Sequence, residues 1–108
     1  MKARSVVLRA QAEQDVNAAV DFYLGEAGQK VALGFIDALE RAYRLIGERP
    51  EAGSGRYAHD LDLAGLRTWP LRGYPHLVFY MLRDDHIDVW RVLHAANDIP
   101  AWLINESD

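Results

Sequence analysis

Hydrophobic residues recur every three or four positions along two stretches in the first half of the chain. The first stretch begins at Ala10, and the second follows a break at Gly25 to Gly28. This spacing places the apolar side chains on one side of an α-helix. The two stripes are Val16, Ala19, Val20, Tyr23, Leu24 and Ala27, and then Ala32, Phe35, Ile36, Leu39, Tyr43 and Ile46. They predict an antiparallel helix hairpin, with Gly47 and Pro50 ending the second helix.

Short runs of aromatic and β-branched residues predict strands in the second half. Residues 76–82 and 87–93 contain the densest runs, which indicates the two central strands of a sheet. Residues 66–71 form a third run. Because proline has no N–H to donate, Pro70 places this third strand at an edge of the sheet or at a bend.

The remaining segments complete the expected fold. Residues 1–8 predict a short edge strand, and residues 51–63 lack periodicity and predict a loop. After His94, Pro100 predicts an ordered turn, or one helical turn, that packs Trp102. The fold class is therefore α+β, with an N-terminal strand and a helix hairpin packed on a small antiparallel sheet.

The residues between the two central strands, 84–85, predict a hairpin turn. A two-residue turn pairs Leu82 with Ile87 and Tyr80 with Val89. One face then carries Val78, Tyr80, Leu82, Ile87, Val89 and Arg91, and the other carries Leu77, Phe79, Met81, Asp88, Trp90 and Val92. Both faces are largely apolar, and one helix hairpin covers only one of them. The second face needs a cover from the C-terminal tail or from another protein chain.

Composition restricts the function further. The chain has 108 residues, half of them apolar, which fits a single domain over residues 1–108. It has no cysteine, so disulfides and thiolate metal sites are excluded. The net charge of −4 gives no general attraction to nucleic acid, and we expect no direct sequence-specific DNA binding. No stretch approaches the ~18 apolar residues of a membrane span, so we expect a cytoplasmic protein that binds no membrane.

The sequence also lacks the glycine loops that bind phosphates and the histidine spacing typical of zinc sites, so we expect no cofactor and no metal. His94 follows the last strand, where a side chain can emerge at the rim of a sheet. Arg67, Arg72 and Arg91 are expected to lie close together and to bind acidic groups of a partner. Alternatively, the arginines of this region form solvated ion pairs with its aspartates. The arginines are Arg56, Arg67, Arg72, Arg83 and Arg91, and the aspartates are Asp60, Asp62, Asp84, Asp85 and Asp88.

Aromatic residues of the sheet region pack in the core or form an interface with a hydrophobic partner. Both lysines of the chain lie outside this region, and arginine cannot act as a general base near neutral pH. We therefore expect a binding protein rather than an enzyme. The candidates for contact with a partner are Arg67, Trp69, Arg72, Tyr80, Arg83, Trp90, Arg91 and His94.

Three segments of the second half suggest a known family. They are Leu66 and Arg67, the aromatic strand at residues 77–80, and the ending at residues 89–94 followed by residues 98–100. Together with the order of elements along nearly the whole chain, they resemble the ParE branch of the RelE/ParE toxins of bacterial type II toxin–antitoxin systems. The resemblance implies a toxin held inactive by a cognate antitoxin, whose C-terminal segment wraps over it.

The resemblance leaves different classes of action open. ParE-like toxins are associated with poisoning of DNA gyrase, whereas RelE-like toxins cleave messenger RNA on the ribosome. RelE-like cleavage relies on a basic surface and commonly on lysines in the sheet, which this acidic chain lacks. Gyrase inhibition is therefore favoured. In the alternative, His94 is the acid or base of an endoribonuclease, with Arg67, Arg72 and Arg91 on the phosphate. A third possibility is a degenerate toxin that only binds its antitoxin.

Overall fold

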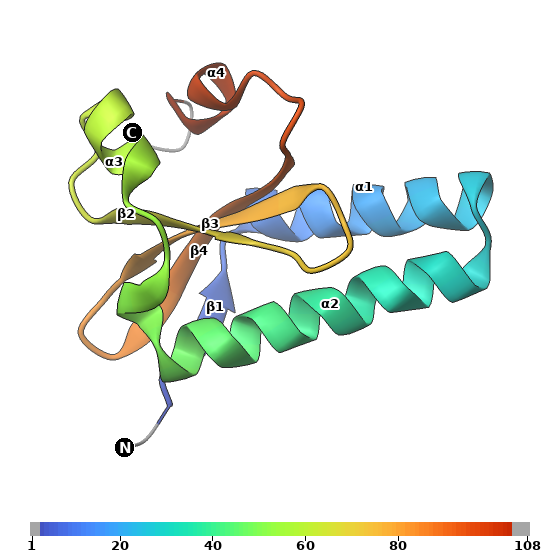
Figure 1. Cartoon of the computed structure of the whole chain (residues 1–108), viewed down its shortest axis with the longest axis horizontal. Coiled ribbons are helices and arrows are strands. Elements are labelled where there is room, and N and C mark those ends of the chain that lie inside the picture. Colours follow the sequence, from blue (N-terminus) through green and yellow to red (C-terminus); the bar gives the residue numbers. More distant parts are fainter. Residues whose placement is uncertain (1–2, 105–108) are drawn as a thin grey trace.

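Strand β4 (His86–His94) lies inside a four-stranded sheet in the computed structural model, which describes residues 3–104 (Figure 1). Its neighbours are β1 (Ser5–Leu8), which runs parallel to it, and β3 (His76–Leu82), which runs antiparallel. Strand β2 (Leu66–Pro70) pairs antiparallel with β3 and forms the second edge. Both predicted edge strands are confirmed. The sheet is mixed rather than wholly antiparallel because β1 joins β4 in the parallel direction.

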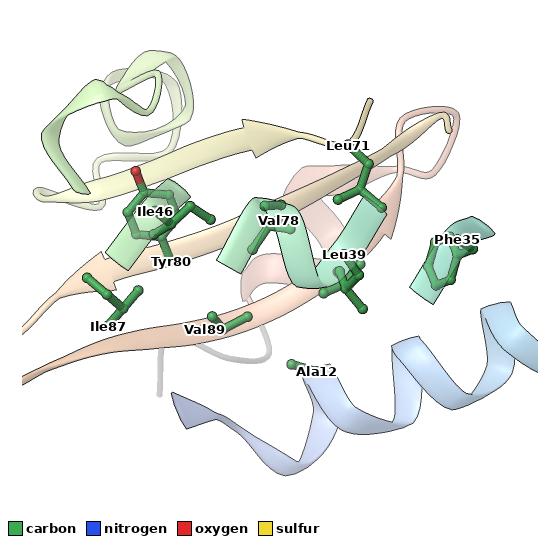
Figure 2. Close-up of a cluster of buried hydrophobic side chains, with 11 residues drawn as sticks. Ala12, Phe35, Leu39, Ile46, Leu71, Val78, Tyr80, Ile87 and Val89 are labelled. Atoms are coloured by element: carbon green, nitrogen blue, oxygen red, sulfur yellow. The ribbon is translucent and has the colours of Figure 1, made fainter. Parts of the chain in front are cut away.

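Helices α1 (Ala10–Glu26) and α2 (Gln29–Glu48) cover one face of the sheet, which confirms the predicted hairpin and the α+β class (Figure 1). Their apolar stripes meet side chains of β3 and β4 in a first hydrophobic cluster, drawn in Figure 2. Its buried members are Ala12, Phe35, Leu39, Ala42, Ile46, Leu71, Val78, Tyr80, Ile87, Val89 and Val92. No helix within residues 3–104 is long and apolar enough to cross a membrane.

Gly47 lies inside α2 and allows the first residues of the chain to approach this helix. A Cβ at Gly47 would lie 2.8 Å from the carbonyl oxygen of Arg4, and the Arg4 N–H donates to the Gly47 carbonyl at 3.1 Å. The predicted role of Gly47 as a stop signal is therefore wrong. The helix ends one residue later, at Glu48, shortly before Pro50.

The opposite face of the sheet is covered by two short helices of the same chain, α3 (Arg56–Leu61) and α4 (Ile99–Ile104) (Figure 1). They pack against a second hydrophobic cluster, whose buried members are Leu66, Phe79, Trp90, Leu93, Ile99 and Leu103. The C-terminal tail, one of the two covers left open by the sequence, thus covers part of this face. Its buried residues are Ile99 and Leu103, whereas Trp102, which was expected to pack, is 44% exposed.

The prediction of a loop over residues 51–63 is wrong, because the 3₁₀ helix η1 (Pro50–Ala52) and helix α3 both form there. Tyr57, Ala58 and Leu61 supply the apolar side of α3 and pack on the second cluster. A helix of 6 residues is too short for hydrophobic periodicity to reveal it among glycines and polar residues.

Strands β3 and β4 pair as predicted near their turn, but a β-bulge follows. The register shifts between Tyr80 and Phe79, so Phe79 faces Arg91 and Trp90 becomes the extra residue. A bulge reverses the alternation of faces beyond it. Val92 consequently packs in the cluster beneath α1 and α2, and the faces predicted for Arg91 and Val92 are wrong.

Candidate partner-binding surfaces

Three of the predicted contact residues are buried in the interior of the folded protein. Tyr80 is fully buried, and Trp90 and Arg91 are 4% and 5% exposed. The Tyr80 hydroxyl donates to the Pro50 carbonyl at 2.6 Å and so joins β3 to η1. The structure therefore places these three residues inside the fold, which for Tyr80 and Trp90 is the core position that the sequence left open beside an interface. The aromatic character of a strand does not show which of its two faces is covered.

Arg91 is held between the first and last helices of the chain. Its Nε and Nη2 atoms donate to the two carboxylate oxygens of Asp15 in α1, each at 2.7 Å. Its Nη1 donates to the Trp102 carbonyl in α4 at 3.2 Å, and the guanidinium lies 4.9 Å from the centre of the Trp102 ring. Asp15 also accepts the N–H of Val92 at 3.0 Å. Arg91 thus stabilises the position of both helices on β4.

Arg83 belongs to a second network, centred on the buried Asp88. Arg83 and Arg9 each donate two hydrogen bonds to the Asp88 carboxylate, at 3.0–3.1 Å, and the Trp90 indole N–H adds a third donor at 3.2 Å. Burial alone would raise the pKa of Asp88, but the hydrogen bonds from Arg9 and Arg83 outweigh it and lower this pKa below its ordinary value. The predicted pairing of arginines with aspartates is therefore confirmed for Arg83.

The structure does not gather Arg67, Arg72 and Arg91 into one cluster. Arg67 donates to the main-chain carbonyls of Glu51 and Gly53 at 3.0 and 2.9 Å, beside η1. Arg91 is directed to α1, and Arg72 lies in a recess beside α2. The expected cluster does not form, because the three side chains lie against different elements.

His94 is exposed at the end of β4, as its position in the sequence predicted. Its Nδ1 atom accepts the N–H of Ala96 at 3.0 Å, and its ring centre lies 5.3 Å from that of His76. His76 is 8% exposed, and its Nδ1 has no partner among residues 3–104. Burial, together with the nearby His94 ring, lowers the pKa of His76 to about 4. Within residues 3–104, no group of three His, Asp or Glu side chains is arranged to hold a metal ion.

A groove of about 560 Å³ runs between α1, the end of β4 and α4, and we call it the α1–α4 groove. Its lining includes Ala18, Phe22, Tyr23, Leu93, His94 and Trp102. Phe22 is 61% exposed and Trp102 is 44% exposed. The sequence analysis missed Phe22, because this residue lies outside the apolar stripe of α1. A large aromatic residue on the predicted polar side of a helix was the available signal.

A smaller recess of about 210 Å³ lies between α2 and β2, and we call it the α2–β2 recess. It is lined by Ala38, Arg41, Ala42, Leu45, Trp69, Pro70 and Arg72. Two of the predicted contact residues, Trp69 and Arg72, thus meet at this recess, as Arg91 and His94 do in the α1–α4 groove, and α2 adds a second arginine to the recess, Arg41. Sequence spacing could not show that Arg41 and Arg72 line the same recess, because α2 and β2 approach each other only in the folded chain.

Comparison with known proteins agrees with this architecture. A solved structure described as "Chromosomal ParDE TA system from P. aeruginosa" contains a chain that matches with a TM-score of 0.70 and 21% sequence identity. The match covers 85% of this chain and 96% of that chain, and it supports a common fold. A search among curated proteins finds no match. A family model described as "ParE toxin of type II toxin-antitoxin system, parDE" matches residues 6–99, and the chain therefore belongs to the ParE toxin family.

Proposed function

We propose that a cognate antitoxin neutralises this toxin by direct binding in the α1–α4 groove. The observation that carries the proposal is the exposure of two large aromatic side chains, Phe22 and Trp102, which both line this groove. Large exposed apolar side chains that lie together mark interaction sites more often than isolated ones do. Membership of the family indicates that the partner is an antitoxin, since the matching family model describes toxins of toxin–antitoxin systems.

The lining of the groove favours an amphipathic protein segment as its occupant. Apart from the paired Asp15 and Arg91, the lining carries no formally charged side chain. Gln11, Gln14 and Asn97 offer neutral hydrogen-bonding groups along it. A segment with apolar residues on one side and polar residues on the other matches these groups, and we assign this role to the C-terminal segment of the antitoxin.

When the antitoxin is absent, we propose that the toxin inhibits DNA gyrase by binding it. Family membership supports this target, and the distribution of side chains supports binding rather than catalysis. Arg67 and Arg91 already donate to groups of the chain itself, and no carboxylate pairs with His94 within residues 3–104. An acid–base mechanism needs a proton donor and an acceptor within reach of one substrate. We expect toxin, antitoxin and gyrase to meet in the cytoplasm.

The direct test is a supercoiling assay with purified gyrase and toxin. The proposal expects loss of supercoiling, or accumulation of cleaved DNA complexes, as toxin is added. When the antitoxin is added before the toxin, gyrase should keep its full supercoiling activity. Full supercoiling at a large excess of toxin, with no cleavage complexes, would remove gyrase as the target. A toxin that also leaves growth unaffected without its antitoxin would be only a binding module.

Ribosome-dependent cleavage of messenger RNA is the second candidate. The exposed position of His94 at the rim of the sheet is the observation that favours it. In this mechanism His94 acts as acid or base, and Arg72 contributes to phosphate binding. The variant His94→Ala should then abolish growth arrest while the protein stays folded. Retained growth arrest in a folded His94→Ala toxin would exclude this candidate.

A further inference from the structure

Two exposed arginines line the α2–β2 recess without a partner of their own. Arg41 extends from α2, and Arg72 follows the end of β2. Neither forms a hydrogen bond or an ion pair within the described part of the chain, whereas Arg67 and Arg83 both have partners. Two positive charges at one small recess repel each other unless an anion binds between them.

We infer that this recess binds an acidic segment of a partner protein, with carboxylates held by Arg41 and Arg72 beside Trp69. A guanidinium group presents paired N–H donors that fit the two oxygens of a carboxylate. Both arginines are exposed, so they can reach such a ligand without any rearrangement of the core.

The walls of the recess strengthen this binding. Trp69 is half-buried and packs against the cluster beneath α2, and Ala38, Ala42 and Leu45 complete an apolar surface. An ion pair formed against apolar walls is less screened by water than one on an open surface. The recess therefore favours a carboxylate over the solvent ions that surround an isolated arginine.

The edge of the sheet at this place is closed to strand addition, so a partner must be recognised through side chains. The N–H and C=O of Thr68 both bond with Ser54 at 2.9 Å, and the Leu66 N–H donates to the Leu63 carbonyl at 3.1 Å. Pro70 has no N–H. An extended peptide consequently finds few free main-chain groups on β2, and the arginines and Trp69 provide the available contacts.

The net charge of the chain and the size of the recess favour a protein segment over a nucleic acid as the ligand. The chain carries a net charge of −4, which opposes a polyanion at longer range. Binding of a nucleic acid draws on the release of counterions from many phosphates, and two arginines neutralise few of them. A recess of about 210 Å³ accepts one or two side chains.

This surface shares no lining residue with the α1–α4 groove, so both can be occupied together. Under the proposed function, the recess is the contact for the target rather than for the antitoxin. This one assignment rests on the proposed function. The binding of an acidic segment does not, and its test requires neither gyrase nor antitoxin.

The test is a titration of the whole protein with a glutamate-only peptide, followed through the indole N–H signal of Trp69 in a ¹H–¹⁵N NMR spectrum. We expect a saturable shift of this signal that weakens as salt is added. The double variant Arg41→Gln, Arg72→Gln should bind the peptide at least about tenfold more weakly. Its spectrum should otherwise remain that of the folded protein, because both side chains are exposed.

The matched control is the double variant Arg49→Gln, Arg56→Gln. It removes the same total charge from two exposed arginines that lie outside the recess. Its affinity for the peptide should stay within about twofold of the parent. Three results would each overturn the inference: no saturable shift of Trp69, equal weakening in both double variants, or tighter binding of single-stranded DNA of the same charge.

Two further measurements test whether the recess contacts the target: affinity for the antitoxin and growth arrest. Affinity of the Arg41→Gln, Arg72→Gln variant for the antitoxin should stay within about twofold of the parent, because the groove is unchanged. Growth arrest by this variant in the absence of antitoxin should be reduced. Full growth arrest, or a tenfold loss of antitoxin affinity, would overturn the assignment while leaving the peptide result to be judged separately.

Discussion

Asp15 and Arg91 form a buried ion pair in which both carboxylate oxygens accept hydrogen bonds of 2.7 Å from the guanidinium. Their side chains are 11% and 6% exposed. Removal of Asp15 deprives the buried Arg91 charge of the carboxylate that binds two of its N–H groups, so Asp15→Ala should lower the free energy of unfolding by about 3 kcal/mol. Urea denaturation measures this change. Asn17→Ala, at an exposed position of the same helix, should stay within about 0.5 kcal/mol of the parent.

A double-variant cycle separates this pair from its surroundings. Asp15→Ala combined with Arg91→Met leaves no unpaired charge, so the double variant should lose less stability than the sum of the two single variants. Additive losses would show that the two side chains act independently, which would contradict the structural role assigned to Arg91.

His76 should make stability fall in mild acid. Its pKa is about 4 in the folded chain and near 6.5 in the unfolded chain, so the unfolded state binds the proton first as the pH falls. The stabilisation is complete above about pH 6.5 and is lost progressively toward pH 4. Between pH 7 and pH 5, the free energy of unfolding should drop by about 1–2 kcal/mol more in the parent than in His76→Phe. Equal losses in the two proteins would exclude His76 as the cause.

Gly53 and Tyr80 should show coupled effects. A Cβ at Gly53 would overlap the Tyr80 hydroxyl, which is fixed by its hydrogen bond to Pro50. Gly53→Ala should therefore destabilise the protein by about 1–3 kcal/mol. In a Tyr80→Phe background the overlap with the hydroxyl is gone, although the ring remains within 2.9 Å, so the same substitution should cost less. Thermal denaturation of the four proteins tests this, and an equal cost in both backgrounds would contradict the overlap.

Phe22 should contribute to antitoxin affinity without contributing to stability. Phe22→Ser removes an aromatic side chain that is 61% exposed on the lining of the groove. Affinity for the antitoxin, measured by calorimetry, should fall about 30-fold, which corresponds to about 2 kcal/mol. Leu24→Ser is the matched control, since Leu24 is an exposed apolar residue of the same helix outside the groove. Equal effects of the two substitutions would place the antitoxin elsewhere.

The parts of the fold that the sequence predicted correctly are those fixed by local pattern. The stripe from Ala32 to Ile46 specifies α2, because side chains three and four residues apart share one side of a helix. The two aspartates at 84–85 fix the turn, and thereby the pairing of β3 and β4 near it. A resemblance over most of the chain predicted the family that the matching model confirms.

The parts that the prediction missed depend on contacts between distant segments. The bulge at Trp90 changes the face of every later residue in β4, and local sequence carries no clear sign of it. The partner of Arg91 lies in α1, 76 residues earlier in the chain, so the side chain that defines its role could not be identified by spacing. Likewise, Arg41 and Arg72 share a recess only because α2 packs beside β2.

The pairing of β1 with β4 has a consequence for the synthesis of the toxin. Residues 5–8 are translated before the other three strands, but within residues 3–104 their partners in the sheet are residues 86–89. Strand β3 likewise lies against β4 along its whole length. Of the two inner strands of the sheet, β4 is thus translated last, and contacts between distant segments form late in folding. A cell that produces this protein is therefore not exposed to a folded toxin until residues 86–94 have been translated.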